Sequence, residues 1–234
     1  MLLAIDAGNT NIVFAVFQKD KVQGLWRCKT DTGRTSDEYL SFLSQLFEIE
    51  NLKLEDVSAV IISSVVPDAN FELSQFARKA FSCKPQFVGA DIPNLGLRID
   101  VDKPSEVGAD RLVNAVAVLE YYKAPAVVVD FGTATTFDVV NKDSVFCGGV
   151  IAPGVNLSLA ALHMAAAKLP KITIAQPTHA IGRNTIDAMQ AGVFWGYVGV
   201  VQKMLQKITE ELGAPPLVIA TGGLATLFKD HIPE

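Results

Sequence analysis

The chain has 234 residues, half of them apolar, with a net charge of −5 and an isoelectric point near 5.3. This is enough apolar sequence to bury one large core or two smaller ones. The acidic balance provides no basic surface for a phosphate backbone, so nucleic acid is not expected as a partner. The longest apolar run, residues 191–201, is about half of the roughly 20 residues that cross a membrane, and the start lacks a positively charged leader region. We therefore expect a cytoplasmic protein, without a membrane partner, that acts on a small molecule.

The chain opens with "MLLAIDAGNTNIVFAVF", which predicts two apolar strands joined by a turn after Asp6. A tight turn needs only Gly8, so the carboxylate and the polar side chains at residues 9–11 require another explanation. The same pattern recurs in "VVVDFGTATTFDVV", where Asp130 and Gly132 have the spacing of Asp6 and Gly8. Strand-like segments at residues 59–67 and 217–225 form a second matching pair. These repeats predict two related domains, residues 1–123 and 124–234, with an insertion in the second domain around residues 148–170.

Helices are predicted between these strands. Residues 35–50 place apolar side chains on one face, and Thr35 with Glu38 has the pattern of a capping box. Helical periodicity also covers residues 68–81, 108–122 and 184–212, the last of which ends at Gly213. Strand hairpins followed by alternating helices and strands indicate an α/β chain with mixed sheets.

The two Asp-x-Gly turns suit phosphate binding. Carboxylates that face one site repel each other and repel phosphate unless a cation lies between them, and Mg²⁺ with a nucleotide meets this condition. Asp6 would hold the hydrated ion while turn amides and the side chains of residues 9–11 donate to phosphate oxygens. A turn-capping role for Asp6 and Asp130 is the simpler alternative. Two such turns in the same register favour phosphate binding, and no Walker or Rossmann fingerprint competes.

Six segments, in order along nearly the whole chain, resemble the type III pantothenate kinases. They are "DAGNTNIVFAVF", "GADRLVNA", "DFGTATTFDVV", "GGVIAPG", "GRNTIDAMQAG" and "ATGGLA". That family belongs to the superfamily of acetate kinase, sugar kinases, Hsp70 and actin. The resemblance implies two similar actin-like (ribonuclease H-like) domains, each with a mixed sheet flanked by helices, and a nucleotide cleft between them.

The resemblance also implies an activity: transfer of the γ-phosphoryl group of ATP to pantothenate, the first step towards coenzyme A. It places the catalytic base at Asp110 and a monovalent cation, K⁺ or NH₄⁺, at Asp130. The implied ATP contacts are Asp6, Ala7, Gly8, Asn9, Thr10, Asn11, Ile12, Val13 and Thr133. The implied pantothenate contacts are Gly108, Ala109, Asp110, Arg111 and Thr185. From the residues alone, helix capping by Asp110 or Thr185 and a surface ion pair for Arg111 remain alternatives.

Two features depart from the family pattern. Val101 stands where many members have a tyrosine that helps to bind substrate, and the chain ends soon after residue 225, where members usually continue through another helix. The resemblance further implies a homodimer, and we expect the helix bearing Gly192, Gly196 and Gly199 to serve it; packing within the subunit is the alternative.

Two other functions remain open from the sequence. One is a non-catalytic, ATP-binding regulatory paralogue of the same fold, and the other is a kinase for a different alcohol or acid. A protein that had lost catalysis would not need to keep Asp6, Asp110, Arg111 and Asp130 together, so their joint presence favours an enzyme.

Overall fold

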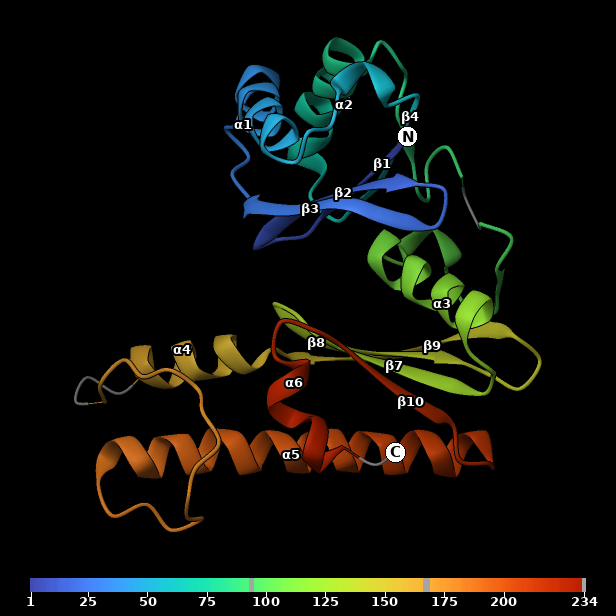
Figure 1. Ribbon diagram of the computed structural model, residues 1–234. Helices are drawn as coiled ribbons and strands as arrows, with labels where there is room; N and C mark the ends of the chain where they lie inside the picture. The colour runs from blue at the N-terminus through green and yellow to red at the C-terminus, as the bar shows by residue number, and fades with distance from the viewer. Residues whose placement is uncertain (93–94, 166–168, 233–234) are drawn as a thin grey trace. The chain divides into compact units, whose positions relative to one another are not determined.

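The computed structural model describes residues 1–92, 95–165 and 169–232 (Figure 1). The chain forms two compact units. Unit 1 comprises residues 1–97 and 103–113, and unit 2 comprises residues 98–102 and 114–234. The division falls within helix α3 (Ala109–Tyr121), whereas the sequence suggests a boundary between residues 123 and 124. That boundary stays a prediction.

Unit 1 is built on a five-stranded mixed sheet with the order β3-β2-β1-β4-β5. Its first three strands are antiparallel neighbours, whereas β4 pairs in parallel with both β1 and β5. The strands are β1 (Leu2–Ala7), β2 (Asn11–Gln18), β3 (Lys21–Lys29), β4 (Ala59–Ser64) and β5 (Gln86–Phe87). The helices are α1 (Ser36–Ile49) and α2 (Pro67–Phe81), with short 3₁₀ turns at Leu54–Asp56 and Pro104–Glu106.

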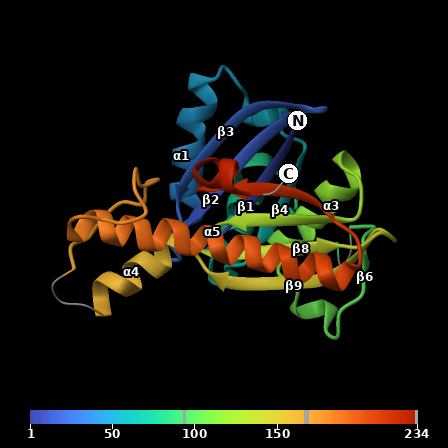
Figure 2. The same cartoon turned by 90° about the horizontal axis from the view of Figure 1, so that it is seen from below.

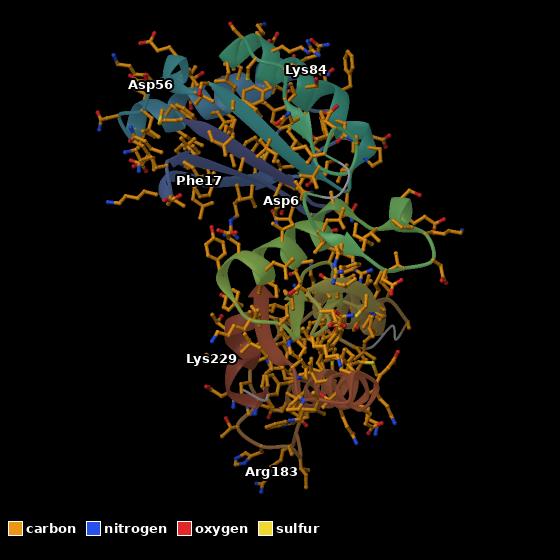
Figure 3. The ribbon with its side chains drawn as sticks, turned by 90° about the vertical axis from the view of Figure 1, so that its right-hand side faces the viewer. Asp6, Phe17, Asp56, Lys84, Arg183 and Lys229 are labelled. Carbon is orange, nitrogen blue, oxygen red and sulfur yellow. The ribbon has the colours of Figure 1, made fainter. Side chains whose placement is uncertain are left out.

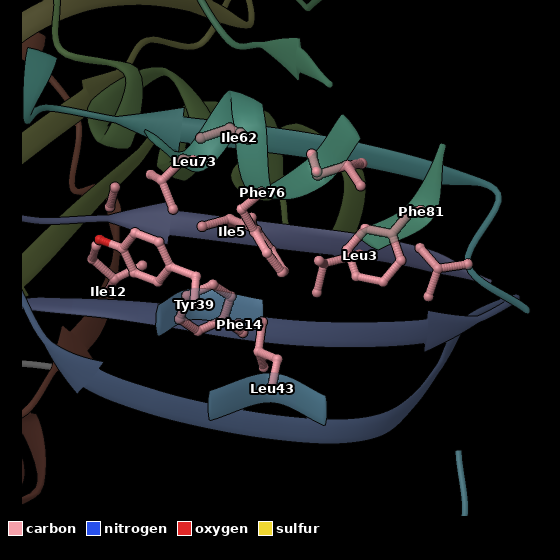
Figure 4. Close-up of a cluster of buried hydrophobic side chains, with 14 of the residues drawn as sticks. Leu3, Ile5, Ile12, Phe14, Tyr39, Leu43, Ile62, Leu73, Phe76 and Phe81 are labelled. Carbon is pink, nitrogen blue, oxygen red and sulfur yellow. The ribbon is translucent and has the colours of Figure 1, made fainter. Parts of the chain in front are cut away.

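The core of unit 1 lies between this sheet and helices α1 and α2, which cover the same face (Figures 1 and 4). Alternation along β1 buries Leu3 and Ile5 on that face. Phe14 contacts the rings of Tyr39 from α1 and Phe76 from α2, with centroid distances of 6.1 and 6.4 Å. These contacts fix the strand ends that carry the first Asp-x-Gly turn. The predicted capping box of Thr35 and Glu38 begins α1 and is confirmed.

Unit 2 has a second five-stranded mixed sheet, ordered β10-β7-β8-β9-β6. Its strands are β6 (Arg98–Ile99), β7 (Ala126–Phe131), β8 (Ala134–Val140), β9 (Val145–Pro153) and β10 (Leu217–Gly222). Its helices are α4 (Val155–Ala165), α5 (Thr185–Leu212) and α6 (Ala225–Phe228), followed by a 3₁₀ turn at Lys229–His231. Helix α5 runs along the sheet (Figure 2), where Phe194 and Val201 join Val127 and Val129 in one core.

The predicted internal repeat is confirmed by the strand orders. The strand order β3-β2-β1-β4 in the sheet of unit 1 matches the order β9-β8-β7-β10 in the sheet of unit 2. Corresponding strand pairs are parallel or antiparallel in the same way. Unit 2 carries α4 within the predicted insertion, of which residues 166–168 lie outside the described residues. The predicted helix at 184–212 is α5, closed by Gly213 at φ +70°. Across the described residues, no helix combines the length and apolar character needed to span a membrane.

Candidate active site

The first candidate site lies at the end of β1 in unit 1. Asp6, labelled in Figure 3, precedes the turn and lies in register with Ser63 of the parallel strand β4. Its side chain is accessible to solvent at this edge, yet the protein around it raises its pKa, mainly by desolvation. The neighbouring Ser63 hydroxyl opposes this rise, and the charge of Asp110 adds to it. The structure therefore brings Asp6, Ser63 and Asp110 together.

The turn that follows Asp6 is held by backbone and side-chain hydrogen bonds. The Gly8 N–H donates to the Asn11 carbonyl at 3.0 Å, which closes the turn. The Thr30 hydroxyl donates to the Gly8 carbonyl at 2.6 Å, and the Thr30 N–H donates to the Thr10 carbonyl at 2.9 Å. Asn9 and Thr10 are exposed at the tip. The turn is thus a fixed backbone loop with polar side chains open to solvent, as a phosphate-binding loop requires.

Asp110 lies in the first turn of α3. The Gly108 carbonyl accepts the N–H groups of Arg111 and Leu112 at 3.1 and 3.2 Å, which starts the helix. Oδ1 of Asp110 accepts the Arg111 N–H at 2.8 Å, so the carboxylate is held against the helix start. A Cβ at residue 108 would lie 2.5 Å from this oxygen. The half-buried Asp110 is thus held at the helix start, from where its charge acts on Asp6.

The second Asp-x-Gly turn lies in unit 2. Asp130 lies near the end of β7, in register with Thr221 of β10 and Thr136 of β8. Gly222 follows in β10 with φ +91°, and a Cβ there would lie 2.5 Å from Asp130 Oδ1. The carboxylate therefore occupies space that only a glycine leaves open.

Thr133 lies in this second turn, which the Gly132 N–H closes by donating to the Ala134 carbonyl at 3.1 Å. Gly154, the first residue after β9, packs directly on the turn. A Cβ on Gly154 would lie 2.2 Å from the Thr133 carbonyl oxygen and 2.8 Å from that of Gly132. In both repeats the residue that follows the third strand thus lies directly against the turn.

Thr185 is the first residue of α5, but it is not the cap of that helix. Asn184 is the N-cap, and its Oδ1 accepts the Asp187 N–H at 2.9 Å. Thr185 instead lines a cavity of about 610 Å³ in unit 2, whose other lining residues include Ser158, Leu162 and Met189. The helix-capping alternative for Thr185 is therefore wrong, and its side chain is open to a ligand.

Some residues near these sites were not predicted from the sequence. Ser63 and Thr30 come from segments distant from the turn that they contact, and only the polar ends of their strands hint at them. Asp138 is fully buried in β8, where Asn114 Nδ2 donates to its Oδ2 at 3.1 Å. Val101, where the resemblance leads us to expect a tyrosine, lies near Gly148 in unit 2.

The side chains near these sites limit the kind of cation site that the protein can form. Among the described residues, no group of three or more His, Cys, Asp or Glu side chains could enclose a metal ion. A cation here would use one protein carboxylate, with water or ligand oxygens completing its shell, as Mg²⁺ does with nucleotides. Asp6 beside the turn, and Asp130 over Gly222, fit that kind of binding.

Sequence comparisons with known proteins agree on one family. A family model described as type III pantothenate kinase matches residues 2–207. The type III pantothenate kinase of Paramagnetospirillum magneticum is 58% identical over 230 residues, which cover 98% of this chain and 88% of the relative. That of Rhodospirillum rubrum is 53% identical over 230 residues, which cover 98% and 90%. A solved structure, the activator of the 2-hydroxyisocaproyl-CoA dehydratase from Clostridium difficile with bound ADPNP, aligns with a TM-score of 0.52. It covers 97% of this chain and 81% of its own at 11% identity, and this likeness shows the fold alone.

Proposed function

This chain belongs to the type III pantothenate kinase family, and we propose that it transfers the γ-phosphoryl group of ATP to the primary hydroxyl of pantothenate. The product would be 4′-phosphopantothenate, in the first step of coenzyme A synthesis. The resemblance drawn from the sequence motifs is confirmed, as are the kinase class and the fold of two similar mixed-sheet domains.

One observation carries the assignment of the site. Asp6 leads into the turn at residues 8–11, whose backbone is held by Thr30, and the charge of Asp110 acts on Asp6 and raises its pKa. Two carboxylates that repel each other destabilise a protein that has no ligand bound. The two acids have separate uses in a kinase, if Asp6 holds the cation that accompanies the nucleotide and Asp110 accepts a proton from the acceptor hydroxyl.

The transfer needs a base, a fixed nucleotide and an aligned acceptor. In our proposal, Asp110 accepts the proton of the pantothenate hydroxyl as that oxygen bonds to the γ-phosphorus. The bond between the γ-phosphorus and the bridging oxygen breaks, and ADP leaves with the electron pair. Residues 6–13 and Thr133 hold the phosphates through N–H and side-chain donors, because phosphoryl transfer depends chiefly on positioning and charge stabilisation.

We propose two cation positions. Asp6 would hold Mg²⁺ through water, and Asp130 would hold a monovalent cation, K⁺ or NH₄⁺. The cations supply charge neutralisation for the phosphates. The solvent-accessible carboxylate of Asp6 and the absence of a side chain at Gly222 over Asp130 support these positions.

For pantothenate, we propose contacts from residues 108–111 and from Thr185. The backbone at the start of α3 offers an anion-binding helix end, and the Arg111 guanidinium suits a carboxylate. The cavity beside Thr185 is lined mainly by apolar side chains, in keeping with an aliphatic acceptor.

We further propose a cytoplasmic homodimer without nucleic-acid or membrane partners. On α5, a Cβ built at Gly192, Gly196 or Gly199 would meet nothing within 4 Å among the described residues. Trp195 and Val200 are 38% and 36% exposed beside them. Packing within the subunit therefore leaves room beside these three glycines, and a second copy would bury them.

The test is ADP release by purified protein with ATP, Mg²⁺ and K⁺, measured with and without pantothenate. Turnover that depends on pantothenate would support the proposed reaction. Nucleotide binding without turnover on any alcohol would instead support the regulatory paralogue. Turnover with another alcohol or acid in place of pantothenate would change the acceptor while keeping the kinase.

A further inference from the structure

Thr30 is held against the first Asp-x-Gly turn by both its backbone and its side chain. It is the residue that follows β3, and it is only partly exposed. Its hydroxyl donates to the Gly8 carbonyl at 2.6 Å, and its N–H donates to the Thr10 carbonyl at 2.9 Å. Thr30 thus holds two peptide groups of the turn, those that carry the Gly8 and Thr10 carbonyls.

These two hydrogen bonds determine which way the turn amides point. In a planar trans peptide, the C=O and the following N–H point in opposite directions. With the carbonyls of Gly8 and Thr10 held on Thr30, the N–H groups of Asn9 and Asn11 are directed to the opposite side. An anion-binding loop needs its N–H groups directed to one side before the ligand arrives.

The internal repeat provides independent support. Asn11 pairs with Lys29 at the start of β2, and Ala134 pairs with Pro153 at the start of β8. Thr30 and Gly154 are therefore equivalent positions of the two repeats. Gly154 approaches the carbonyls of Gly132 and Thr133, as Thr30 approaches those of Gly8 and Thr10. In both units the residue after the third strand lies against the backbone of the turn, and Thr30 adds a hydrogen-bonding side chain.

We propose that Thr30 is a positioning residue for nucleotide binding: its hydroxyl holds the Gly8 carbonyl so that the turn presents its N–H groups to the phosphates of ATP. The proposal rests on the proposed assignment of residues 6–13 to ATP. Thr30 itself need not touch the nucleotide. Its effect is therefore on ATP affinity, while the rate of the chemical step with bound ATP depends on Asp110.

The variants are Thr30→Val, which removes the hydroxyl at nearly constant volume, and Thr30→Ser, which restores it. Ser44→Ala is a matched control in the same unit, because the Ser44 hydroxyl also donates to a backbone carbonyl, that of Leu40, at 2.7 Å. All three variants would be measured by calorimetric titration with Mg²⁺ and a non-hydrolysable ATP analogue, and by thermal melting.

We expect Thr30→Val to weaken analogue binding by about tenfold and to raise the KM for ATP similarly, with kcat within about twofold. Thr30→Ser should bind within about twofold of the parent, and Ser44→Ala should bind like the parent even if it melts lower. Parental binding by Thr30→Val, failure of Thr30→Ser to restore binding, or equal weakening by Ser44→Ala would overturn the proposal.

The titration needs no pantothenate, so it separates this proposal from the proposed reaction. A parent protein that binds the analogue but does not phosphorylate pantothenate would overturn the reaction, and the Thr30 variants would still be compared. A parent protein that does not bind the analogue would overturn the role of the turn and of Thr30 with it.

Discussion

The carboxylate of Asp110 occupies the space in which a side chain at Gly108 would begin. A Cβ on Gly108 would lie 2.5 Å from Asp110 Oδ1, and the same oxygen accepts the Arg111 N–H at 2.8 Å. The carboxylate cannot withdraw from Gly108 without losing this hydrogen bond. The glycine and the acid of the Gly-Ala-Asp-Arg segment are therefore a single requirement for placing the proposed base.

Replacing the proposed base should abolish most turnover without unfolding the protein. Asp110→Asn is nearly isosteric but cannot accept the hydroxyl proton, so we expect kcat to fall by roughly two orders of magnitude or more. Pantothenate-dependent ADP release measures this, with Asp20→Asn, an exposed acid in the turn between β2 and β3, as the control. Near-parental activity of Asp110→Asn would remove Asp110 from the mechanism.

Gly108→Ala tests the placement of the base rather than its chemistry. The added methyl group would displace the Asp110 carboxylate, and we expect kcat to fall by about ten- to a hundredfold while binding of an ATP analogue is kept. Gly33→Ala is the control, since a Cβ there would lie 3.4 Å from Asp31 Oδ1, at the limit of ordinary contact. Equal kcat values for the two variants would contradict the proposed steric coupling.

Asp6 should destabilise the unliganded protein at neutral pH. Burial and the charge of Asp110 raise its folded-state pKa above the ordinary value of 3.8, so the folded state binds its proton more tightly than the unfolded state does. The penalty is fully present above the folded pKa and disappears as the pH falls below the ordinary value.

Asp6→Asn should therefore melt higher than the parent near pH 8 without nucleotide, and this difference should shrink towards pH 4 and disappear below the ordinary carboxyl pKa. The same variant should lose Mg²⁺-dependent binding of an ATP analogue. Thermal melting across this pH range and a binding titration measure the two effects. A lower melting temperature for Asp6→Asn at pH 8 would show that Asp6 stabilises the fold instead.

The proposed cation at Asp130 predicts a dependence on the monovalent salt. Replacing K⁺ with Na⁺ at constant ionic strength should lower turnover severalfold. K⁺, the larger of the two ions, suits the proposed site at Asp130, where water and ligand oxygens would complete the coordination. Asp130→Asn should lower activity in K⁺ and remove the difference between the two salts. Turnover measured in each chloride salt decides this, and equal rates of the parent in both would argue against a monovalent ion at Asp130.

The glycine stripe on α5 predicts the oligomeric state. We expect light scattering at micromolar concentration to give a dimer, and Gly196→Lys to give a monomer because a long charged side chain would enter the proposed interface. Gln18→Lys introduces the same side chain at an exposed position of unit 1, away from α5, and should remain dimeric. A monomeric parent protein would refute the proposed dimer.

Local sequence patterns predicted much of the fold. The paired Asp-x-Gly turns, the Thr35–Glu38 capping box and the end of α5 at Gly213 all depend on residues close together in the chain, and the structure confirms them. The matching order of the two sheets agrees with the repeated hairpin and with the second matching pair of strand segments.

The surroundings of the site residues could not be predicted in the same way. Ser63 reaches Asp6 only through the parallel register of β4 with β1, and Thr30 reaches Gly8 only because β3 pairs with β2. These contacts depend on pairing between distant segments, which one sequence does not specify. Asn184 rather than Thr185 caps α5, since the cap depends on backbone geometry that differs between adjacent residues.

The equivalence of Thr30 and Gly154 has a consequence for how the two repeats can diverge. At residue 30 the turn is held by a hydroxyl, a chemical feature that more than one amino acid supplies. At residue 154 the turn leaves no room for a side chain, since a Cβ there would lie 2.2 Å from the carbonyl oxygen of Thr133. Residue 30 can therefore change to another hydroxyl-bearing amino acid and keep the geometry of the first turn. Residue 154 can only be glycine, because any other amino acid would place a Cβ against the second turn.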